Sequence, residues 1–568
     1  MKENAFCAAQ RQVQELIAKS AESTEKIPVS PAPDNTQADA SSPVCFSLAK
    51  KEKTDPVKLA EKLCEQINKH IKDNQLVSSC KAEKGYLNFK FSNKFFQQTL
   101  LQSQEENFGK NDFGQGKTAI IDFSSPNVGK PLHIGHIRST ILGDSIRKLL
   151  DFCGYKTTAS NYLCEAGMQV AKLMLAVKEF GEKKIKDEKD LLEYYVKINE
   201  KIEADEKLKQ KANEIVEKME NGDKSTTKLL EKVRNMSLKP IRKNYEVLNV
   251  EFDEECFDST LVETSKKIVQ EALDKKIAFK DEKEEVVADL ENHSKLSNLI
   301  ILRSNNTTLY STRDLALADY RWKKHKFDLN IYVTASEQNT HFRQVFKILE
   351  LLGRPYVEKC RHLGFGLIFL EGGKKLSTRK GSVLLLEDVL NEAKQKAKEE
   401  IKRKGEYSQQ ETEHIAQTVG QGSLKFAVLR VGAEKNIHFS TKQAVSFEGD
   451  TGAYLQYTLV RAQNILNKAE RTDTQKNNYA LDDAEQKIVK TIAQFPLIIE
   501  NACKNRSPQQ LCDYLLKLAS QFSAFYASHP VLQAKNQQQF QRLKIVRATK
   551  NVLSNGLGLL GIQKPEKM

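Results

Sequence analysis

Two strand–helix–strand patterns, far apart along the chain, most restrict what this sequence can fold into. In the first pattern, an apolar run at residues 118–123 leads through turn-forming residues into a helix-periodic segment at 137–149. A further strand pattern follows near residues 157–163. A strand, a crossover helix and a parallel strand form a βαβ unit, so the sequence predicts an α/β fold with a parallel sheet.

The second pattern comprises a strand at residues 329–333, a helix at 341–352 and a strand at 362–370. Between the two patterns lies a stretch rich in Lys and Glu with helical periodicity, at about residues 183–245. We therefore predict that residues 113–390 form a Rossmann-like domain whose parallel sheet is interrupted by this helical insertion.

The chain on either side of this domain predicts three further regions. Residues 1–47, whose composition becomes rich in Ser, Pro and Ala after residue 20, are expected to form a flexible N-terminal segment. Residues 48–112 combine a helix-periodic stretch with a strand pattern at 85–91, which indicates a small α+β module. Residues 391–568 are helix-patterned nearly throughout and predict an all-α bundle.

Charge and cysteine usage limit the class of protein. The 568 residues include 89 Lys+Arg and 75 Asp+Glu, and the formal net charge of +14 fits either a polyanionic partner or a lysine-rich solvated surface. The ten cysteines form no Cys-x-x-Cys pair, so neither a zinc site nor a disulfide framework is expected. No apolar run is long enough to span a bilayer, so no membrane partner is expected.

A histidine pair occupies the turn between the first strand and its helix, where residues 124–140 read SSPNVGKPLHIGHIRST. A helix N-terminus presents unpaired amides and a positive dipole end, which predicts a seat for a phosphate. His133 and His136 add donors for a phosphoryl group, and Gly135 leaves room for a flat base. The alternative is a chance pair of loop histidines, which the flanking strand and helix and the nearby Lys130 make less favourable.

A cationic loop follows the second unit, where residues 374–382 read KKLSTRKGS. Such a loop can close on a triphosphate and stabilise the charge that develops on leaving pyrophosphate. A solvated basic loop is the alternative when this segment is considered alone.

These segments resemble a known family. His133 to His136 resemble the HIGH signature of class I aminoacyl-tRNA synthetases, and residues 374–382 stand where that class carries its KMSKS loop. Residues 124–140, and the LYSTRDLA segment at 309–316, are similar to the arginyl-tRNA synthetases. The resemblance runs from about residue 55 to Met568.

The family resemblance implies an arginine–tRNA ligase. Such an enzyme activates L-arginine with ATP to arginyl-adenylate, transfers it to the 3′ end of tRNA(Arg), and releases pyrophosphate and AMP. Activation that requires bound tRNA is implied as well. ATP with Mg²⁺ is expected as a substrate complex, with no structural metal, and the chain is expected to be a monomer.

The resemblance also implies the residues that handle ATP. The catalytic set is Lys130, His133, His136, Lys375 and Ser377, and the ATP-binding set is His133, Gly135, His136, Lys375 and Arg379. The family's second loop lysine falls at Thr378 here, and Lys130, just before the histidine pair, is expected to take over part of its role.

A guanidinium is planar, permanently charged and offers five donors, so a pocket for it needs carboxylates and a hydroxyl. Tyr310 and Asp314 are four residues apart and would share one face of a helix. The arginine-binding residues implied by the resemblance are Asp122, Ser125, Pro126, Asn127, His136, Asp258, Tyr310, Asp314 and Gln338. Asp258 departs from the family, because the chain has Phe257-Asp258-Ser259 where the family reads Gly-Glu-Ser.

Residues at both ends of the chain are implied to contact tRNA: Tyr86, Asn88, Tyr457, Arg461 and Met568. An exposed Tyr86 would suit stacking on an unpaired nucleotide, although a strand that packs its own aromatics is an equal alternative. The pI near 9.0 and the likeness of residues 327–352 to mitochondrial arginyl enzymes predict a location in the mitochondrial matrix, with the cytoplasm as the alternative.

Three alternatives compete with this interpretation. A class I synthetase for another amino acid would lack the carboxylates at Asp122 and Asp314. An inactive RNA-binding relative would have lost His133, His136 and Lys375, which are present. A nucleotidyltransferase with a His-x-x-His motif would need no large helical bundle after its catalytic domain.

Overall fold

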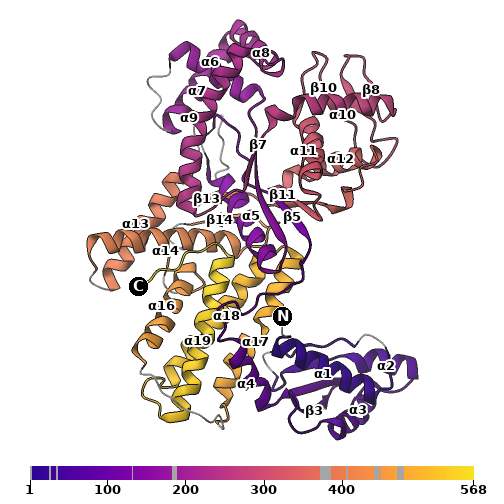
Figure 1. Cartoon of the computed structure of the whole chain (residues 1–568), viewed down its shortest axis with the longest axis vertical. Coiled ribbons are helices and arrows are strands. Elements are labelled where there is room, and N and C mark those ends of the chain that lie inside the picture. Colours follow the sequence, from indigo (N-terminus) through magenta and orange to yellow (C-terminus); the bar gives the residue numbers. More distant parts are fainter. Residues whose placement is uncertain are drawn as a thin grey trace.

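The computed structural model describes residues 3–24, 27–33, 36–130, 132–181, 188–370, 385–404, 407–440, 445–446, 449–469 and 479–568. A five-stranded parallel sheet of order β12-β11-β5-β6-β7 lies near the middle of the molecule (Figure 1). Its strands are β5 (Thr118–Asp122), β6 (Lys156–Leu163), β7 (Glu254–Phe257), β11 (Leu329–Ala335) and β12 (Cys360–Phe365). The predicted parallel α/β sheet is therefore confirmed.

Strand β5 lies in the middle of the sheet and is buried on both faces. Ile120 and Ile121 are both fully buried, as expected for a strand in a sheet that is covered on both sides. Asp122 pairs in register with Ser160 of β6 and with Tyr332 of β11. The carboxyl ends of these strands therefore open at one edge of the sheet, where parallel α/β folds bind ligands.

The helix α5 (Ile134–Phe152) follows β5 and starts immediately after His133. Its apolar positions lie on several faces, because α5 packs against the sheet and also against helices of the C-terminal bundle. The second unit comprises α11 (Tyr310–His325), β11, α12 (Asn339–Leu351) and β12. The predicted strand at residues 362–370 is divided between β12 and β13 (Ile368–Leu370).

Two insertions extend beyond the sheet on opposite sides of the view in Figure 1. The helical insertion predicted at about residues 183–245 corresponds to α7 (Glu188–Ala204), α8 (Glu206–Glu220) and α9 (Lys224–Leu248), and α6 (Met168–Phe180) extends it towards the N-terminus. The second insertion, which the sequence did not predict, carries α10 (Val262–Asp274) and an antiparallel sheet of β8 (Ala278–Lys280), β9 (Val286–Ala288) and β10 (Leu299–Leu302). The two insertions approach each other where Glu220 accepts a hydrogen bond from the backbone N–H of Thr308 at 3.0 Å.

The expected flexible segment at residues 1–47 is wrong for most of its length. Helix α1 (Ala5–Ser20) buries Phe6, Val13 and Ile17, and it contacts α3, α4 and α17. Asn4 caps the helix by accepting from the amide of Cys7. The helical spacing of these apolar residues outweighs the Ser- and Pro-rich composition of the stretch that follows.

The N-terminal module is an antiparallel sheet of order β1-β2-β4-β3 covered by helices. Its strands are β1 (Ser30–Pro31), β2 (Ala40–Ser42), β3 (Val77–Glu83) and β4 (Tyr86–Phe91). Helices α2 (Val44–Glu52) and α3 (Pro56–His70) complete the module, and α4 (Asn93–Gln102) leads out of it. This module lies beside the C-terminal bundle (Figure 1), because α1 and α4 both contact α17.

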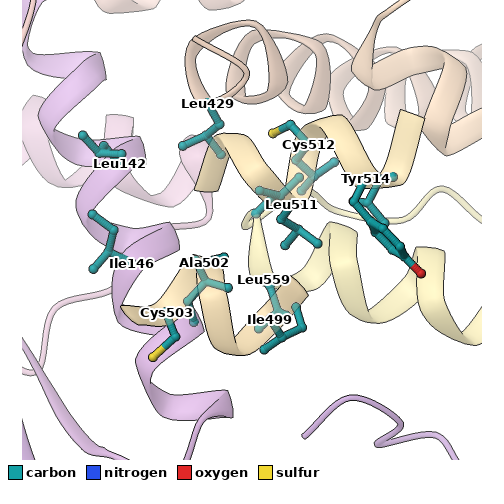
Figure 2. Close-up of a cluster of buried hydrophobic side chains, with 14 of the residues drawn as sticks. Leu142, Ile146, Leu429, Ile499, Ala502, Cys503, Leu511, Cys512, Tyr514 and Leu559 are labelled. Carbon is teal, nitrogen blue, oxygen red and sulfur yellow. The ribbon is translucent and has the colours of Figure 1, made fainter. Parts of the chain in front are cut away.

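The C-terminal part is a helical bundle, as predicted. It contains α13 (Leu386–Lys404), α14 (Gln409–Leu429), α16 (Gly452–Lys468), α17 (Asp483–Asn505), α18 (Pro508–Ser528) and α19 (Asn536–Leu559). A short strand, β14 (Ile437–Phe439), pairs in parallel with β13. Figure 2 shows Leu142 and Ile146 of α5 beside apolar side chains of the bundle, and one buried core joins the parallel sheet to this domain.

Among the described residues, none of the helices combines the length and the apolar character needed to cross a membrane. The same residues contain no group of three or more His, Cys, Asp or Glu side chains arranged to hold a metal ion.

Candidate active site

A cleft of about 770 Å³ opens where β5 and β11 end and α11 begins. Six of the nine residues expected to bind arginine line it: Asp122, Ser125, Asn127, Tyr310, Asp314 and Gln338. Asn298, Ile300 and His341 also line the cleft, and they come from the second insertion and from α12. The fold thus brings together residues that are separated by more than two hundred positions in the chain.

Helix α11 presents its first turn to this cleft. Tyr310 and Asp314 both line it, as their four-residue spacing predicts. The Oδ2 of Asp314 lies 2.6 Å from Nε2 of His341, and the side chain of Asp314 is 14% exposed. Asp314 is therefore a carboxylate at the cleft surface with one oxygen already held by a histidine.

Asp122 lies deeper, at the end of β5. Its Oδ2 lies 3.2 Å from NH2 of the fully buried Arg321, and its Oδ1 accepts a hydrogen bond from Oγ of Ser125 at 3.0 Å. Burial raises the pKa of Asp122 and the charge of Arg321 opposes that rise. The positive charge of Arg321 balances the negative charge of Asp122, so this carboxylate adds little net negative charge to the cleft.

Asp258 does not line the cleft. It is fully buried, accepts the amide hydrogens of Glu165 and Ala166 at 2.7 and 2.8 Å, and lies 3.2 Å from Nε of Arg313. The side chain of Asp258, which is shorter than the glutamate of the family, thus contacts groups of the protein itself. The structure thus gives no support to the expected guanidinium contact of Asp258.

The histidine pair forms the start of α5. The amide of Gly135 donates to Nδ1 of His133 at 3.1 Å, and the amide of His133 donates to Nδ1 of His136 at 3.2 Å. The expectation of unpaired amides is therefore wrong at these two positions. Because each Nδ1 accepts, the proton of each neutral ring lies on Nε2, which can donate to an anion.

Burial keeps both histidines uncharged. It lowers the pKa of His133 to about 4, and the nearby charge of Lys130 acts in the same direction. The pKa of His136 is lowered well below the ordinary value by burial, by His133 and by Lys130. The two rings, whose centroids are 4.0 Å apart, can therefore share one turn without mutual repulsion.

Gly135 and Lys130 complete this corner. A side-chain Cβ at position 135 would lie 2.8 Å from Cε1 of His133, so glycine leaves the space that the imidazole occupies. The Nζ of Lys130 lies 5.1 Å from the centre of the Tyr195 ring, which gives the ammonium group an aromatic neighbour in the helical insertion.

Ser124 and Ser125 follow β5 in the left-handed region, with φ of 69° and 46°. Such backbone costs about 1–3 kcal/mol per residue and persists where contacts over-determine it. The Ser124 amide donates to Oγ of Ser139 at 2.9 Å, and the Ser125 amide donates to Oδ1 of Asn161 at 3.2 Å. These bonds turn the chain away from the sheet and direct Ser125 and Asn127 towards the cleft.

The other predicted site residues fall into two groups. Pro126 is buried, and neither it nor His136 lines the cleft. Lys375, Ser377 and Arg379 lie outside the described residues. Of the described chain that flanks them, β13 contacts α5, and Leu385 forms a β-bridge with His133 at the start of α5.

The candidate tRNA contacts lie at two places. Tyr86 of β4 is 43% exposed, and Asn88 is half-buried on the same face of the strand. Tyr457 of α16 and Met568 pack against one cluster formed by α13, α14 and α16, and Arg461 lies over the ring of Tyr526 at 4.4 Å. Tyr457 and Met568, far apart in sequence, therefore belong to one corner of the bundle.

Sequence reasoning gave no role to His341, Arg321 or Arg313. His341 stands three residues after Gln338, so helical spacing could have placed it at the same site. Arg321 lies seven residues after Asp314, on the same face of α11. The partners of both residues come from other elements, and only the tertiary structure reveals them.

Comparison with known proteins agrees with the geometry. Residues 96–440 match the family model for the catalytic domain of class I (R) tRNA synthetases, residues 455–568 match the DALR anticodon-binding domain, and residues 8–91 match the arginyl-tRNA synthetase N-terminal domain. The match to the N-terminal domain begins at residue 8, whereas the family resemblance noted in the sequence starts at about residue 55. The earlier start agrees with the presence of helix α1.

Curated relatives match nearly the whole chain. An arginine–tRNA ligase of Clostridioides difficile is 36% identical over 98% of this chain and 97% of its own length. One of Halothermothrix orenii is 36% identical over 92% of this chain and 93% of its own length.

Two solved structures share the fold. The arginyl-tRNA synthetase of Thermus thermophilus has a TM-score of 0.81 at 24% identity, with 98% of this chain and 100% of that chain covered. That of Plasmodium falciparum has a TM-score of 0.81 at 22% identity, with 99% of each chain covered.

The parallel sheet, the histidine pair at the start of α5 and the matched catalytic domain define a class I aminoacyl-tRNA synthetase. Within that class, the chain belongs to the arginyl-tRNA synthetase family, whose members join arginine to tRNA at the expense of ATP. It is thus an arginine–tRNA ligase.

The expected mitochondrial location is wrong. It depended on the basic pI and on the likeness of residues 327–352 to mitochondrial enzymes, whereas curated relatives that match more than nine-tenths of the chain, those of Clostridioides difficile and Halothermothrix orenii among them, are bacterial.

Proposed function

We propose that the cleft binds L-arginine with its guanidinium at Asp314 and Tyr310. The observation that carries this proposal is the contrast between the two carboxylates among the described lining residues. Asp122 faces the permanent charge of Arg321, whereas Asp314 faces a histidine at the cleft surface. A guanidinium therefore finds a carboxylate acceptor at Asp314, with the hydroxyl of Tyr310 one helical turn away.

The other end of the amino acid is assigned to polar side chains near the strand ends. Asn127 and Gln338 line the cleft from the turn after β5 and from the start of α12, and Ser125 lies between Asn127 and Asp122. These groups suit the ammonium and carboxylate of the substrate, which need acceptors and donors respectively.

ATP is assigned to the start of α5. The Nε2 protons of His133 and His136 would donate to its phosphates, and Lys130 would stabilise their charge. Lys375, Ser377 and Arg379 are proposed to act on the leaving pyrophosphate, and Mg²⁺ is proposed to accompany ATP as part of the substrate complex.

The reaction then proceeds in two transfers. The carboxylate of arginine attacks the α-phosphorus of ATP, and pyrophosphate leaves with its bonding electron pair. A ribose hydroxyl at the 3′ end of tRNA then attacks the arginyl carbonyl and loses its proton, and AMP leaves. Positioning and charge complementarity supply most of the catalysis, and Tyr86, Asn88, Tyr457, Arg461 and Met568 are the proposed tRNA contacts.

The test is ATP–pyrophosphate exchange with each proteinogenic amino acid, with and without total tRNA. Exchange with arginine that requires tRNA is the expected result. Exchange that is faster with another amino acid would overturn the assignment of the cleft to arginine.

A further inference from the structure

Lys425 of α14 is a fully buried lysine outside the catalytic cleft. Its Nζ donates to the backbone carbonyl of Gly561 at 2.6 Å. Burial lowers the pKa of Lys425 to about 7, and the charge of Asp144 opposes this effect while Lys148 adds to it. Lysine is almost never fully buried unless it is paired, so this position has a specific role in the packing of the domain.

The partner of Lys425 can come so close because residue 561 is glycine. Gly561 has φ of +67°, a conformation that residues with a Cβ rarely adopt. A Cβ at this position would lie 2.7 Å from Oδ2 of Asp144 and 3.1 Å from Nζ of both Lys148 and Lys425. The backbone of residue 561 therefore fits against a cluster of charged groups that a side chain would push apart.

Asp144 and Lys148 of this cluster belong to α5, the helix that begins at the histidine pair. Asp144 is buried and forms ion pairs with Lys148 and, at 3.6 Å, with Arg147. The next residue, Ser145, donates from Oγ to the carbonyl of Leu559 at 3.0 Å. Two consecutive residues of α5 thus reach the end of α19 and the two residues that follow it.

Residues beyond Gly561 continue to the corner of the bundle that carries the proposed tRNA contacts. Gln456 of α16 donates to the carbonyl of Gln563 at 2.8 Å, and Met568 packs in the cluster that includes Tyr457. Figure 2 shows Leu559 near Ile499 of α17, with Leu142 and Ile146 of α5 in the same cluster of buried side chains. Apolar packing therefore supports the polar contacts along the whole junction.

We propose that Lys425, Gly561 and Ser145 form a clamp that fixes the C-terminal tail to both α14 and α5, and that these are positioning residues for the activation of arginine. The tail clamp, defined as the Lys425–Gly561 and Ser145–Leu559 hydrogen bonds, holds the tRNA-binding corner and the ATP-binding histidines in one rigid arrangement. This inference rests on the proposed roles of Met568, Tyr457 and the histidine pair. Its physical basis is the high cost of a buried ammonium group that loses its acceptor, which keeps the tail in one position.

The main test is Lys425→Met, which keeps the length of the side chain and removes the donor. ATP–pyrophosphate exchange with arginine and saturating tRNA is expected to lose about tenfold in kcat, the size of a coupling energy between distant sites. The Kd for tRNA is expected to change less than about threefold. Gln417→Ala, at an exposed position of the same helix, serves as the matched control and should leave both values unchanged.

Ser145→Ala is the second variant, because it removes the other bond of the clamp with little change in volume. A loss of about threefold in kcat is expected, with rates expressed per folded molecule after thermal unfolding has been measured. If Lys425→Met does not fold, the kcat of Ser145→Ala alone decides whether the clamp proposal holds. Folded variants that exchange at the wild-type rate overturn the clamp, whereas a wild-type protein that shows no exchange with arginine overturns the proposed function instead.

Discussion

His341 and Asp314 meet at the cleft, with Nε2 of the histidine 2.6 Å from Oδ2 of the carboxylate. A carboxylate oxygen only accepts, so Nε2 carries the proton in this contact. His341 therefore holds the orientation of Asp314 and leaves the other oxygen to a substrate guanidinium. The residue is a positioning residue for the proposed arginine site.

This relationship predicts the effect of His341→Ala. Without the histidine, Asp314 can rotate, and the KM for arginine is expected to rise about fivefold, equivalent to about one hydrogen bond. The kcat and the KM for ATP should stay within about twofold of wild type, because no reacting group is removed. Steady-state aminoacylation measures all three values. His341→Gln, which keeps a donor, should recover part of the loss, and an equal KM for all three proteins would contradict this role.

Asp258 is expected to affect stability more than substrate binding. Asp258→Asn removes the nearer of the two carboxylates that pair with the buried Arg313, the other being Glu220 at 3.8 Å, and is expected to cost about 3 kcal/mol of unfolding free energy. The single tryptophan, Trp322, lies on the same helix as Arg313, so its fluorescence during urea unfolding reports on this region.

The control for this prediction is Glu263→Gln, which removes an exposed ion pair with Lys267 and should change stability by less than about 1 kcal/mol. The KM for arginine of Asp258→Asn should change by less than about threefold, since Asp258 lies outside the cleft lining. A stable Asp258→Asn protein with a strongly raised KM would show that the residue contacts the substrate after all.

The histidine pair makes stability depend on pH in a defined direction. The pKa of His133 is about 4 in the folded chain and about 6.5 in an unfolded one, so the unfolded chain binds the additional proton between these values. The contribution of His133 to stability is therefore complete above about pH 6.5 and is lost as the pH falls towards 4. Urea unfolding at a series of pH values should show that His133→Asn loses less unfolding free energy than the wild-type protein as the pH falls from about 6.5 to about 4. If the two proteins have the same dependence of unfolding free energy on pH, this result would argue against a neutral His133 in the folded chain.

Gly135→Ala tests the geometry of the same turn. The added methyl group would displace the His133 ring, and kcat for ATP–pyrophosphate exchange is expected to fall about 100-fold, as for a misplacement of about 1 Å. The KM for arginine should change little, because the cleft is formed by other residues. Gly558→Ala is the matched control, since a Cβ there meets no atom within 4 Å.

Much of the fold follows from local patterns. The strand at residues 118–122 and the helix after it are visible as an apolar run, a turn and a 3.6-residue period, and Tyr310 and Asp314 share a face by spacing alone. Strands β8 to β10 were missed because each has only three or four residues, too few for a clear alternation. Helix α1 was not predicted because the Ser- and Pro-rich residues that follow it obscure the helical spacing of Phe6, Val13 and Ile17.

The pairing of charges could not be predicted, because it depends on which elements meet. Asp122 and Asp314 look alike in the sequence, yet one is balanced by Arg321 and the other faces His341. Lys425 has no local signal at all, because its acceptor is a backbone carbonyl 136 residues away.

The most direct test of the central claim is the effect of Asp314→Asn on the choice between arginine and citrulline, whose neutral urea group replaces the guanidinium. ATP–pyrophosphate exchange with tRNA present measures kcat/KM for both compounds. The wild-type protein is expected to prefer arginine by at least about 100-fold, and Asp314→Asn is expected to reduce this preference at least about thirtyfold through loss of activity with arginine. A variant that keeps the wild-type preference would contradict the assignment of Asp314 as the partner of the guanidinium.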